Sequence, residues 1–324
     1  YSIMNIGAGY VSHSFNQYVA MDGDQLVAAD HGDAYPRSMV AGRYDNIATG
    51  ADLNSWYGYD SVNMLSLTGK HGENYTGATL GGLEVTDTSY MIVGSTVKQD
   101  ANYHSNKTAN VYVATVPKDE LDDSKVNYRE ITQYAEDGTY SASVPQLVKV
   151  SDDYYAVLWE ELVKDGFYYH NKDDHSIVNV AFVDGEGNVL GDIQQIAGAL
   201  SDCKPEIINN RVTWYVVRDG NTTFYSFSAD VDNVEGFVGR MYSKALGRQA
   251  EAQGLHDWTN RLLLGLRDGA GISEGFIESD EFAQRKLNNS EYVDTLYNMA
   301  SFAARWIRTA RQQFPGSPRE SAIL

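Results

Sequence analysis

The segment Met241-Tyr242-Ser243-Lys244-Ala245-Leu246-Gly247-Arg248 carries the strongest structural signal in the chain, and Gly254-Leu255-His256-Asp257-Trp258 follows it after five residues. Glycine readily adopts the left-handed conformation that ends many helices, so we expect a first helix to stop at Gly247. A second helix should begin near Ala250 and carry Trp258 as a large apolar anchor. The helical spacing rests on two sets of apolar residues: Phe237, Val238, Met241, Tyr242, Ala245 and Leu246, then Leu255, Trp258, Leu262 and Leu263.

This pattern resembles a helical module of unknown function found near the C-termini of bacterial secreted and surface proteins. The module reads Leu-Tyr-x-x-x-Leu-Gly-Arg, then Gly-Leu-x-x-Trp, then Gly-Phe-x-x-Ser-x-Glu-Phe. It spans residues 234–298, and the matching residues are Tyr242, Leu246, Gly247, Arg248, Gly254, Leu255, Trp258, Gly275, Phe276, Ser279, Glu281 and Phe282.

The chain departs from the module at two places. Ala250-Glu251 stands where the module usually has Pro-Asp, and a second repeat opens at residues 292–297 without a following Leu-Gly-Arg. The resemblance implies a helical architecture and an extracellular or bacterial cell-surface location. It implies no activity, because none is established for the family.

Composition limits the classes of function. The 324 residues are 43% hydrophobic, which is enough for a substantial core and about two domains. The formal net charge of −19 argues against nucleic acid or an anionic membrane as a partner, since both attract basic patches. No apolar run approaches the ~18 residues of a membrane helix, so no membrane span is predicted.

Cysteine usage and the chain start bear on the compartment. Cys203 is the single cysteine, so an intrachain disulfide is excluded and a small apolar core residue is the simplest interpretation. The sequence contains no recognisable signal peptide and starts at Tyr1 rather than at Met, so we expect a mature product or a cut fragment. The oligomeric state is not predicted, and no cofactor-binding motif is found.

Residues 1–228 are predicted to form a β domain. Their apolar runs are short and rich in Val, Ile, Tyr and Thr, which is typical of strands. Asp-Gly pairs between the runs predict hairpin turns at residues 22–23, 137–138, 165–166, 184–185 and 219–220.

Four segments of this domain share one pattern: a short first strand, a polar turn and a stronger apolar second strand. The first strands start at Ser14, Ala78, Ser143 and Cys203, so the units are about 60 to 65 residues apart. The second strands contain residues 26–28, 90–93, 155–159 and 212–216. Such repeats resemble the blades of a β-propeller, of which this domain would hold about four; a β-sandwich without true repeats is the alternative.

A polar joint at residues 229–233 separates the β domain from a helical module over residues 232–314. Asp232 or Asn233 is the predicted cap of the first helix. Residues 315–324 are predicted to be a flexible tail.

Charged and aromatic residues follow the second strands of three repeats. The segments are Asp30-His31-Gly32-Asp33-Ala34-Tyr35-Pro36-Arg37, Trp159-Glu160-Glu161 and Arg218-Asp219. Because loops at one end of a propeller converge on its axis, we predict ligand contacts from Tyr35, Arg37, Trp159 and Arg218. A glycosidase needs two carboxylates at a fixed separation, and the candidates are Asp30, Asp33, Glu160 and Glu161. The alternative is that these charged residues are ordinary solvent-exposed loop ends and form neither a catalytic nor a binding site.

Two further motifs have weaker functional interpretations. His170, Asp174 and His175 could bind a metal, but their spacing also suits a solvated hairpin tip in which Lys172 opposes a cation. Gly271-Ile272-Ser273-Glu274-Gly275 matches a serine-hydrolase string, but it falls in the helical module, where we expect Ser273 to cap a helix.

The sequence therefore predicts a bacterial exported or cell-surface protein without catalytic activity. Its β domain would bind a glycan or protein ligand through a tyrosine-rich surface, and its helical module would be an accessory or assembly unit. The alternative is a propeller-type carbohydrate-active hydrolase that uses the loop carboxylates.

Overall fold

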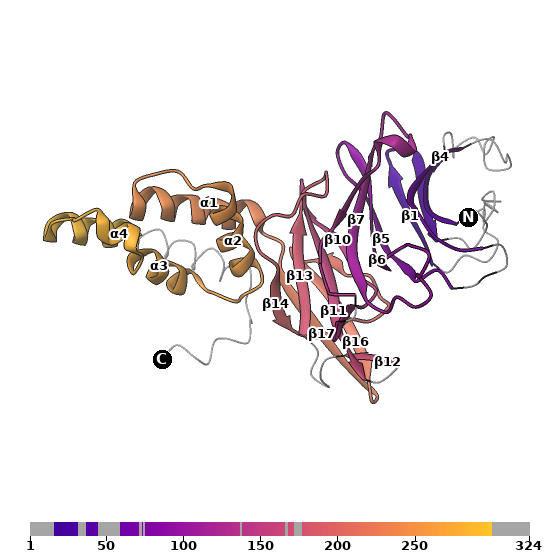
Figure 1. Cartoon of the computed structure of the whole chain (residues 1–324). Helices are drawn as coiled ribbons and strands as arrows, with labels where there is room; N and C mark the ends of the chain where they lie inside the picture. Colours follow the sequence, from indigo (N-terminus) through magenta and orange to yellow (C-terminus); the bar gives the residue numbers. More distant parts are fainter. Residues whose placement is uncertain are drawn as a thin grey trace. The chain divides into compact units, whose positions relative to one another are not determined.

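The computed structural model describes residues 16–31, 37–44, 59–70, 73, 75–136, 138–165, 168–171 and 177–299. The chain divides into two compact units, Tyr1–Ser226 and Phe227–Leu324. The first is built from β-sheets and the second from helices (Figure 1). The prediction of a mainly β chain with a C-terminal helical part is therefore confirmed.

The first two sheets are four-stranded antiparallel meanders in chain order. The first contains β1 (Asn16–Asp22), β2 (Gln25–His31), β3 (Ser38–Tyr44) and β4 (Tyr59–Ser66). The second contains β5 (Ala78–Val85), β6 (Ser89–Val97), β7 (Ala109–Pro117) and β8 (Asn127–Glu130).

The third and fourth sheets are also antiparallel. The third has the order β10 (Gln146–Ser151), β11 (Tyr154–Asp165), β13 (Ile177–Val183) and β14 (Gln194–Ala197), and β9 (Tyr140–Ala142) and β12 (Tyr168–Asn171) pair with the long β11. The fourth contains β15 (Glu206–Ile208), β16 (Arg211–Arg218) and β17 (Asn221–Ser228).

The repeat pattern of the sequence corresponds to the first hairpin of each sheet. The pairs β1–β2, β5–β6, β10–β11 and β15–β16 are each hydrogen-bonded within their own sheet. Two of the predicted turns have the expected backbone. Gly23 has φ +63° between β1 and β2, and Asp219 and Gly220 have φ +50° and +76° between β16 and β17.

The second sheet is buried on both of its faces. Tyr90 and Ile92 of β6 belong to a core shared with the first sheet, and Met91 and Val93 belong to a core shared with the third. Successive side chains of a strand point to opposite faces, so a strand covered on both sides becomes apolar throughout. This explains the continuous apolar run in β6.

Two glycines allow β5 to approach β10 closely. A Cβ atom on Gly81 would overlap the carbonyl oxygen of Pro145, and one on Gly82 would lie 2.7 Å from the Cβ of Leu147. A register shift between Leu80 and Gly82 places Gly81 in a bulge. Contact between these strands therefore requires residues without side chains.

We predict that Gly81→Ala will lower the free energy of unfolding by about 1–3 kcal/mol, because the added methyl group overpacks the contact with Pro145. Urea unfolding of the purified chain would measure this. Gly23→Asn is the matched control, since asparagine tolerates a positive φ and nothing lies within 4 Å of the position. Equal stability of the two variants would contradict the prediction.

The helical unit begins with α1 (Val231–Met241), which continues into a π-helical turn at Tyr242–Leu246. Gly247, with φ +71°, ends this helix as predicted. The unit continues with α2 (Ala252–Leu263), α3 (Gly269–Ile277) and α4 (Asp280–Gln284), and residues 289–299 are helical at the end of the described chain.

Two details of this unit differ from the sequence prediction. Asp230 occupies the cap position of α1, so the prediction of Asp232 or Asn233 is wrong by two or three residues; the Asn233 side chain donates to the Asp230 carboxylate at 2.8 Å. The second helix begins at Ala252 rather than Ala250, because Glu251 remains extended as its cap.

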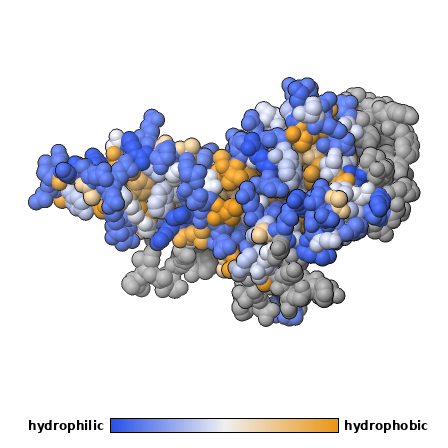
Figure 2. Space-filling model, in the orientation of Figure 1, coloured by the Kyte–Doolittle hydropathy of each residue, from blue (hydrophilic) through white to orange (hydrophobic). Residues whose placement is uncertain are grey.

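The described surface is mainly polar. On the face drawn in Figure 2, hydrophobic patches are separated by hydrophilic side chains. Within the described residues, no helix combines the length and apolarity that crossing a membrane would require.

Candidate functional site

Polar side chains join one end of the first sheet to the start of the second. His31 ends β2, and Arg37 immediately precedes β3. The His31 Nε2 lies 2.9 Å from the Oγ1 of Thr76, and the Nη1 of Arg37 donates to the carbonyl oxygen of Tyr75 at 2.8 Å. Both side chains are buried. They therefore fix the segment that leads into β5.

Three aromatic rings pack together at this end, and we call Tyr75, Tyr103 and His104 the aromatic platform. The Tyr75 ring is stacked on His104 at a centroid distance of 5.3 Å and an interplanar angle of 19°. Tyr103 lies 4.3 Å from His104 and 6.1 Å from Tyr75. Tyr103 is buried, whereas Tyr75 is 41% exposed and the His104 side chain is 52% exposed. The platform therefore presents ring surface to solvent.

Glu73 holds the platform from one side. Its carboxylate accepts hydrogen bonds from the Tyr103 hydroxyl and the Lys70 backbone N–H, and it lies 3.4 Å from the His104 Nε2. The Tyr103 hydroxyl, followed by the Lys70 N–H, lowers the pKa of Glu73 to about 2. A charged, partly exposed hydrogen-bond acceptor therefore stands beside the rings.

The sequence prediction identified Arg37 in this region but missed Glu73, Tyr75, Tyr103 and His104. A signal was present, because residues 98–108 follow the second strand of the second repeat, the position singled out in the other three repeats. That loop contains Tyr103 and His104.

The structure places the predicted residues of the third and fourth sheets in different environments. Glu160 accepts a hydrogen bond from the backbone N–H of Leu200 at 3.1 Å and lies 3.9 Å from the Nη2 of Arg218. Trp159 is 1% exposed in the core, and its indole N–H donates to the Tyr134 hydroxyl at 3.2 Å. Glu160 and Arg218 thus lie together, while the ring of Trp159 does not reach the surface.

Glu161 lies beside Tyr134. Burial is the main cause that raises the pKa of Tyr134 to about 12, and the Glu161 carboxylate adds to it. Asp33, Tyr35, Asp174 and His175 lie outside the described residues, and of His170 only its backbone position in β12 is described. Within the described part of the chain, no three His, Cys, Asp or Glu side chains are grouped for a metal ion.

Asp30 and His31 are neighbours on β2 with opposite electrostatic behaviour. Their side chains point to opposite faces of the strand. Burial raises the pKa of Asp30 to about 6. Burial, and then the neighbouring charge of Arg37, lowers the pKa of His31 to about 4. Near neutral pH, Asp30 is therefore charged and His31 is neutral.

These shifts predict opposing contributions to stability. The raised pKa of Asp30 gives stability that is full below about pH 4 and is lost as the pH rises through about 6. The lowered pKa of His31 gives stability that is full above about pH 6.5 and is lost as the pH falls towards 4. Asp30→Asn should therefore steepen the rise of unfolding free energy between pH 4 and 6, and His31→Asn should flatten it. Urea unfolding at several pH values would measure both; parallel curves for all three proteins would contradict the shifts.

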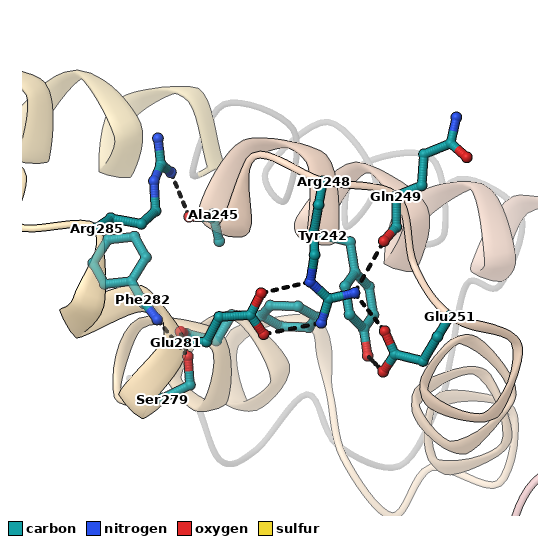
Figure 3. Close-up of polar contacts among 10 residues, drawn as sticks. Tyr242, Ala245, Arg248, Gln249, Glu251, Ser279, Glu281, Phe282 and Arg285 are labelled. Atoms are coloured by element: carbon teal, nitrogen blue, oxygen red, sulfur yellow. Dashed lines mark hydrogen bonds and ion pairs between the residues drawn. The ribbon is translucent and has the colours of Figure 1, made fainter.

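The helical unit has its own polar centre at Arg248 (Figure 3). The Nε and Nη2 of Arg248 donate to the two carboxylate oxygens of Glu281 at 2.5 and 2.9 Å. Its Nη1 donates to the Gln249 carbonyl at 3.0 Å and to the Glu251 carboxylate. The guanidinium also lies 4.9 Å from the centre of the Tyr242 ring. One side chain thus joins the π-helical turn, the start of α2 and the start of α4.

An aromatic layer packs next to this centre. Tyr242 meets Phe276 edge to face at 4.8 Å, and Trp258 lies 5.7 Å from Phe276. Gly254 allows this packing, because a Cβ atom there would overlap the Tyr242 hydroxyl. A Cβ atom on Gly275 would lie 3.1 Å from the Trp258 ring. The two glycines therefore keep α2 and α3 close to the rings.

Capping contacts complete the unit. The Ser279 hydroxyl accepts from the Phe282 N–H at 3.1 Å at the start of α4, and Arg285 donates to the Ala245 carbonyl at 2.5 Å. Residues of the Leu-Gly-Arg, Gly-Leu-x-x-Trp and Ser-x-Glu-Phe strings thus contact one another. In this chain the motif therefore specifies a fold. Glu251 stands where the module usually has Asp, and it supplies the same carboxylate group to Arg248.

Ser273 has neither of its two predicted roles. It lies in the middle of α3, where its hydroxyl donates to the Gly269 carbonyl at 2.8 Å. The cap of α3 is Asp268, whose carboxylate accepts from the Gly271 N–H at 2.8 Å. The expectation of a Ser273 cap was wrong because the helix begins four residues earlier. A strand-to-helix turn, which a hydrolase nucleophile requires, is also not formed here.

We predict that Arg248→Lys will lower the midpoint of thermal unfolding of the helical unit, because lysine cannot make the two parallel hydrogen bonds to Glu281. Circular dichroism at 222 nm would follow the helices. Arg267→Lys is the matched control, since Arg267 is exposed and this substitution, like Arg248→Lys, keeps the positive charge. An equal midpoint for both variants would show that the two parallel hydrogen bonds from Arg248 to Glu281 are not needed for the stability of the helical unit.

Comparisons with known proteins agree with the helical assignment. Residues 220–286 match the model of a protein family described as a domain of unknown function (DUF4214). The match overlaps the helical unit, so the predicted resemblance of this region to a module of unknown function is confirmed. The crystal structure of an endo-arabinase from Bacteroides thetaiotaomicron is similar over 65% of this chain and 69% of that chain, with 12% identity and a TM-score of 0.32. A likeness of that size supports no conclusion about fold or activity. No curated protein matches the chain.

Proposed function

We propose that this chain is a non-catalytic bacterial exported or cell-surface protein whose β unit binds a glycan through the aromatic platform. The observation that carries the proposal is the exposed ring surface of Tyr75 and His104 beside the charged carboxylate of Glu73. A flat ring accepts the apolar C–H face of a sugar, and a charged acceptor binds its hydroxyl groups. The platform supplies the rings, and the Glu73 carboxylate beside it, which accepts from the Tyr103 hydroxyl, supplies the acceptor.

We infer that the four sheets are blades of a β-propeller, about four in number. β5 lies against both β1 and β10. The Nζ of Lys204, just before β15, lies 2.6 Å from the Glu84 carboxylate of β5. Burial, and then the nearby Asp202, raises the pKa of Tyr18 on β1. These contacts support a common axis around which the first strands of all four sheets gather.

The exported location and the accessory role of the helical unit are further parts of the proposal. A net charge of −19 suits a protein that does not bind nucleic acid or anionic lipid. The resemblance of the helical module to those of bacterial surface proteins supports the location. The contacts of Arg248, Tyr242 and Trp258 support a structural or assembly role for that module.

We predict that Tyr75→Ala and His104→Ala will each weaken glycan binding about tenfold or more, since either change removes exposed ring surface. A panel of immobilised neutral and acidic oligosaccharides would identify the ligand, and titration calorimetry would measure the affinity. Tyr128→Ala is the control, because Tyr128 is 38% exposed in the second sheet and stacks on Tyr112. Full binding by both platform variants would contradict the proposal.

The same panel tests the hydrolase alternative. The specific observation in its favour is the raised pKa of Asp30, about 6, which would suit a general acid. Release of reducing ends from any glycan, abolished by Asp30→Asn, would establish catalysis and overturn the non-catalytic function.

A further inference from the structure

The guanidinium group of Arg37 is enclosed but only partly hydrogen-bonded. Arg37 is 2% exposed, and its Nη1 donates to the Tyr75 carbonyl oxygen. Among the described residues, neither its Nε nor its Nη2 has a hydrogen-bond partner. Buried donors in native proteins are almost always satisfied by protein, water or an ion, so these two N–H groups require an acceptor.

Among the described residues, no carboxylate forms an ion pair with Arg37; its charge acts on Tyr103, which donates to the Glu73 carboxylate. The neighbouring His31 is neutral near neutral pH, because burial, and then the charge of Arg37, lowers the pKa of His31 to about 4. The Glu73 carboxylate is engaged by Tyr103, His104 and the Lys70 N–H. A guanidinium remains protonated at any ordinary pH, and a buried unpaired charge is strongly disfavoured. The site therefore favours an anion.

The two free nitrogens have the geometry of an anion fork. Nε and Nη2 form one edge of the planar guanidinium, and their N–H bonds are parallel. Arg248 uses this same edge, Nε and Nη2, to bind both oxygens of Glu281 (Figure 3). In Arg37 the opposite nitrogen, Nη1, is already occupied by Tyr75. Arg37 is thus fixed with its oxyanion-binding edge unused.

The backbone at Gly69 keeps one side of Arg37 closely packed. A Cβ atom on Gly69 would lie 3.1 Å from the Nη1 and 3.2 Å from the Cδ of Arg37. This contact and the Tyr75 bond restrict the rotamer of the arginine. Nε and Nη2 are both buried, so an oxyanion that binds them must enter the packed surroundings of Arg37, and a single small group enters more easily than a whole sugar ring.

We propose that Arg37 binds an oxyanion of the carboxylate or sulfate type bidentately through Nε and Nη2. The identity of the anion rests on the proposed glycan function: it is the acidic group of a sugar whose ring contacts the aromatic platform. Tyr75 links the two, since its carbonyl holds Arg37 and its ring belongs to the platform. In a chain of net charge −19, this is a local site and not a general attraction for anions.

Titration calorimetry of the whole chain with sodium galacturonate, galactose and sodium sulfate tests the proposal, because the two sugars differ in the carboxylate. We expect galacturonate and sulfate to bind, galactose to bind at least tenfold more weakly than galacturonate, and Arg37→Met to remove the difference between the sugars. Arg43→Met is the matched control on β3. Its guanidinium already donates to the Lys118 carbonyl at 2.8 Å and to Asp60 at 3.1 Å, so the preference for galacturonate should persist.

The outcomes separate this proposal from the platform. Binding of sulfate and galacturonate that depends on Arg37 but not on Tyr75 would support the anion site and contradict glycan binding at the platform. Equal binding of galactose and galacturonate, unchanged in Arg37→Met but lost in Tyr75→Ala, would overturn the anion site and retain the platform. If the wild-type chain bound neither sulfate nor galacturonate, the anion site would also be overturned.

A second measurement covers the possibility that Arg37→Met fails to fold. The Nε–H resonance of Arg37 can be followed by NMR in the wild-type chain and identified by its absence in Arg37→Lys. A shift of this resonance on addition of sulfate would support direct binding. A resonance that does not move at saturating sulfate would contradict it.

Discussion

Burial of the second sheet on both faces is the constraint on which the β unit depends. Tyr90 and Ile92 fill the core shared with the first sheet, and Met91 and Val93 fill the core shared with the third. A sheet covered on both sides must be apolar on both sides, and its neighbours must approach closely enough to exclude water. Gly81 allows this close approach where β5 lies against β10, because it has no side chain.

The same packing sets the position of the candidate site. Because the sheets are stacked, the segment that leaves the first sheet must cross to the second, and it carries Tyr75 and Thr76. His31 and Arg37 fix this crossing through hydrogen bonds at 2.9 and 2.8 Å. The aromatic platform is therefore built next to two buried side chains, His31 and Arg37, that hold Thr76 and Tyr75 in place. A binding surface supported in this way loses little conformational entropy when a ligand is bound.

The helical unit follows a different physical rule. Its structure depends on one cation, Arg248, that binds two carboxylates from separate segments and covers the ring of Tyr242. Glycines at positions 254 and 275 allow the aromatic side chains to approach the neighbouring helices. The conspicuous residues of the sequence motif are those that hold the module together, so recognition of the motif predicts a fold and gives no activity.

The amino-acid sequence by itself determined the local features: the β region, its four hairpins, the helix end at Gly247 and the helical module. These depend on side-chain periodicity and on the backbone preferences of glycine, which are properties of neighbouring residues. It also named Arg37 as a candidate ligand contact, which remains a prediction. Only the tertiary structure brought Glu73, Tyr75, Tyr103 and His104 together. It also buried Trp159 in the core and shifted the pKa values of Asp30 and His31, mainly through burial. Contacts between sheets, and the desolvation that accompanies them, depend on segments far apart in the chain, and no local pattern encodes those distances.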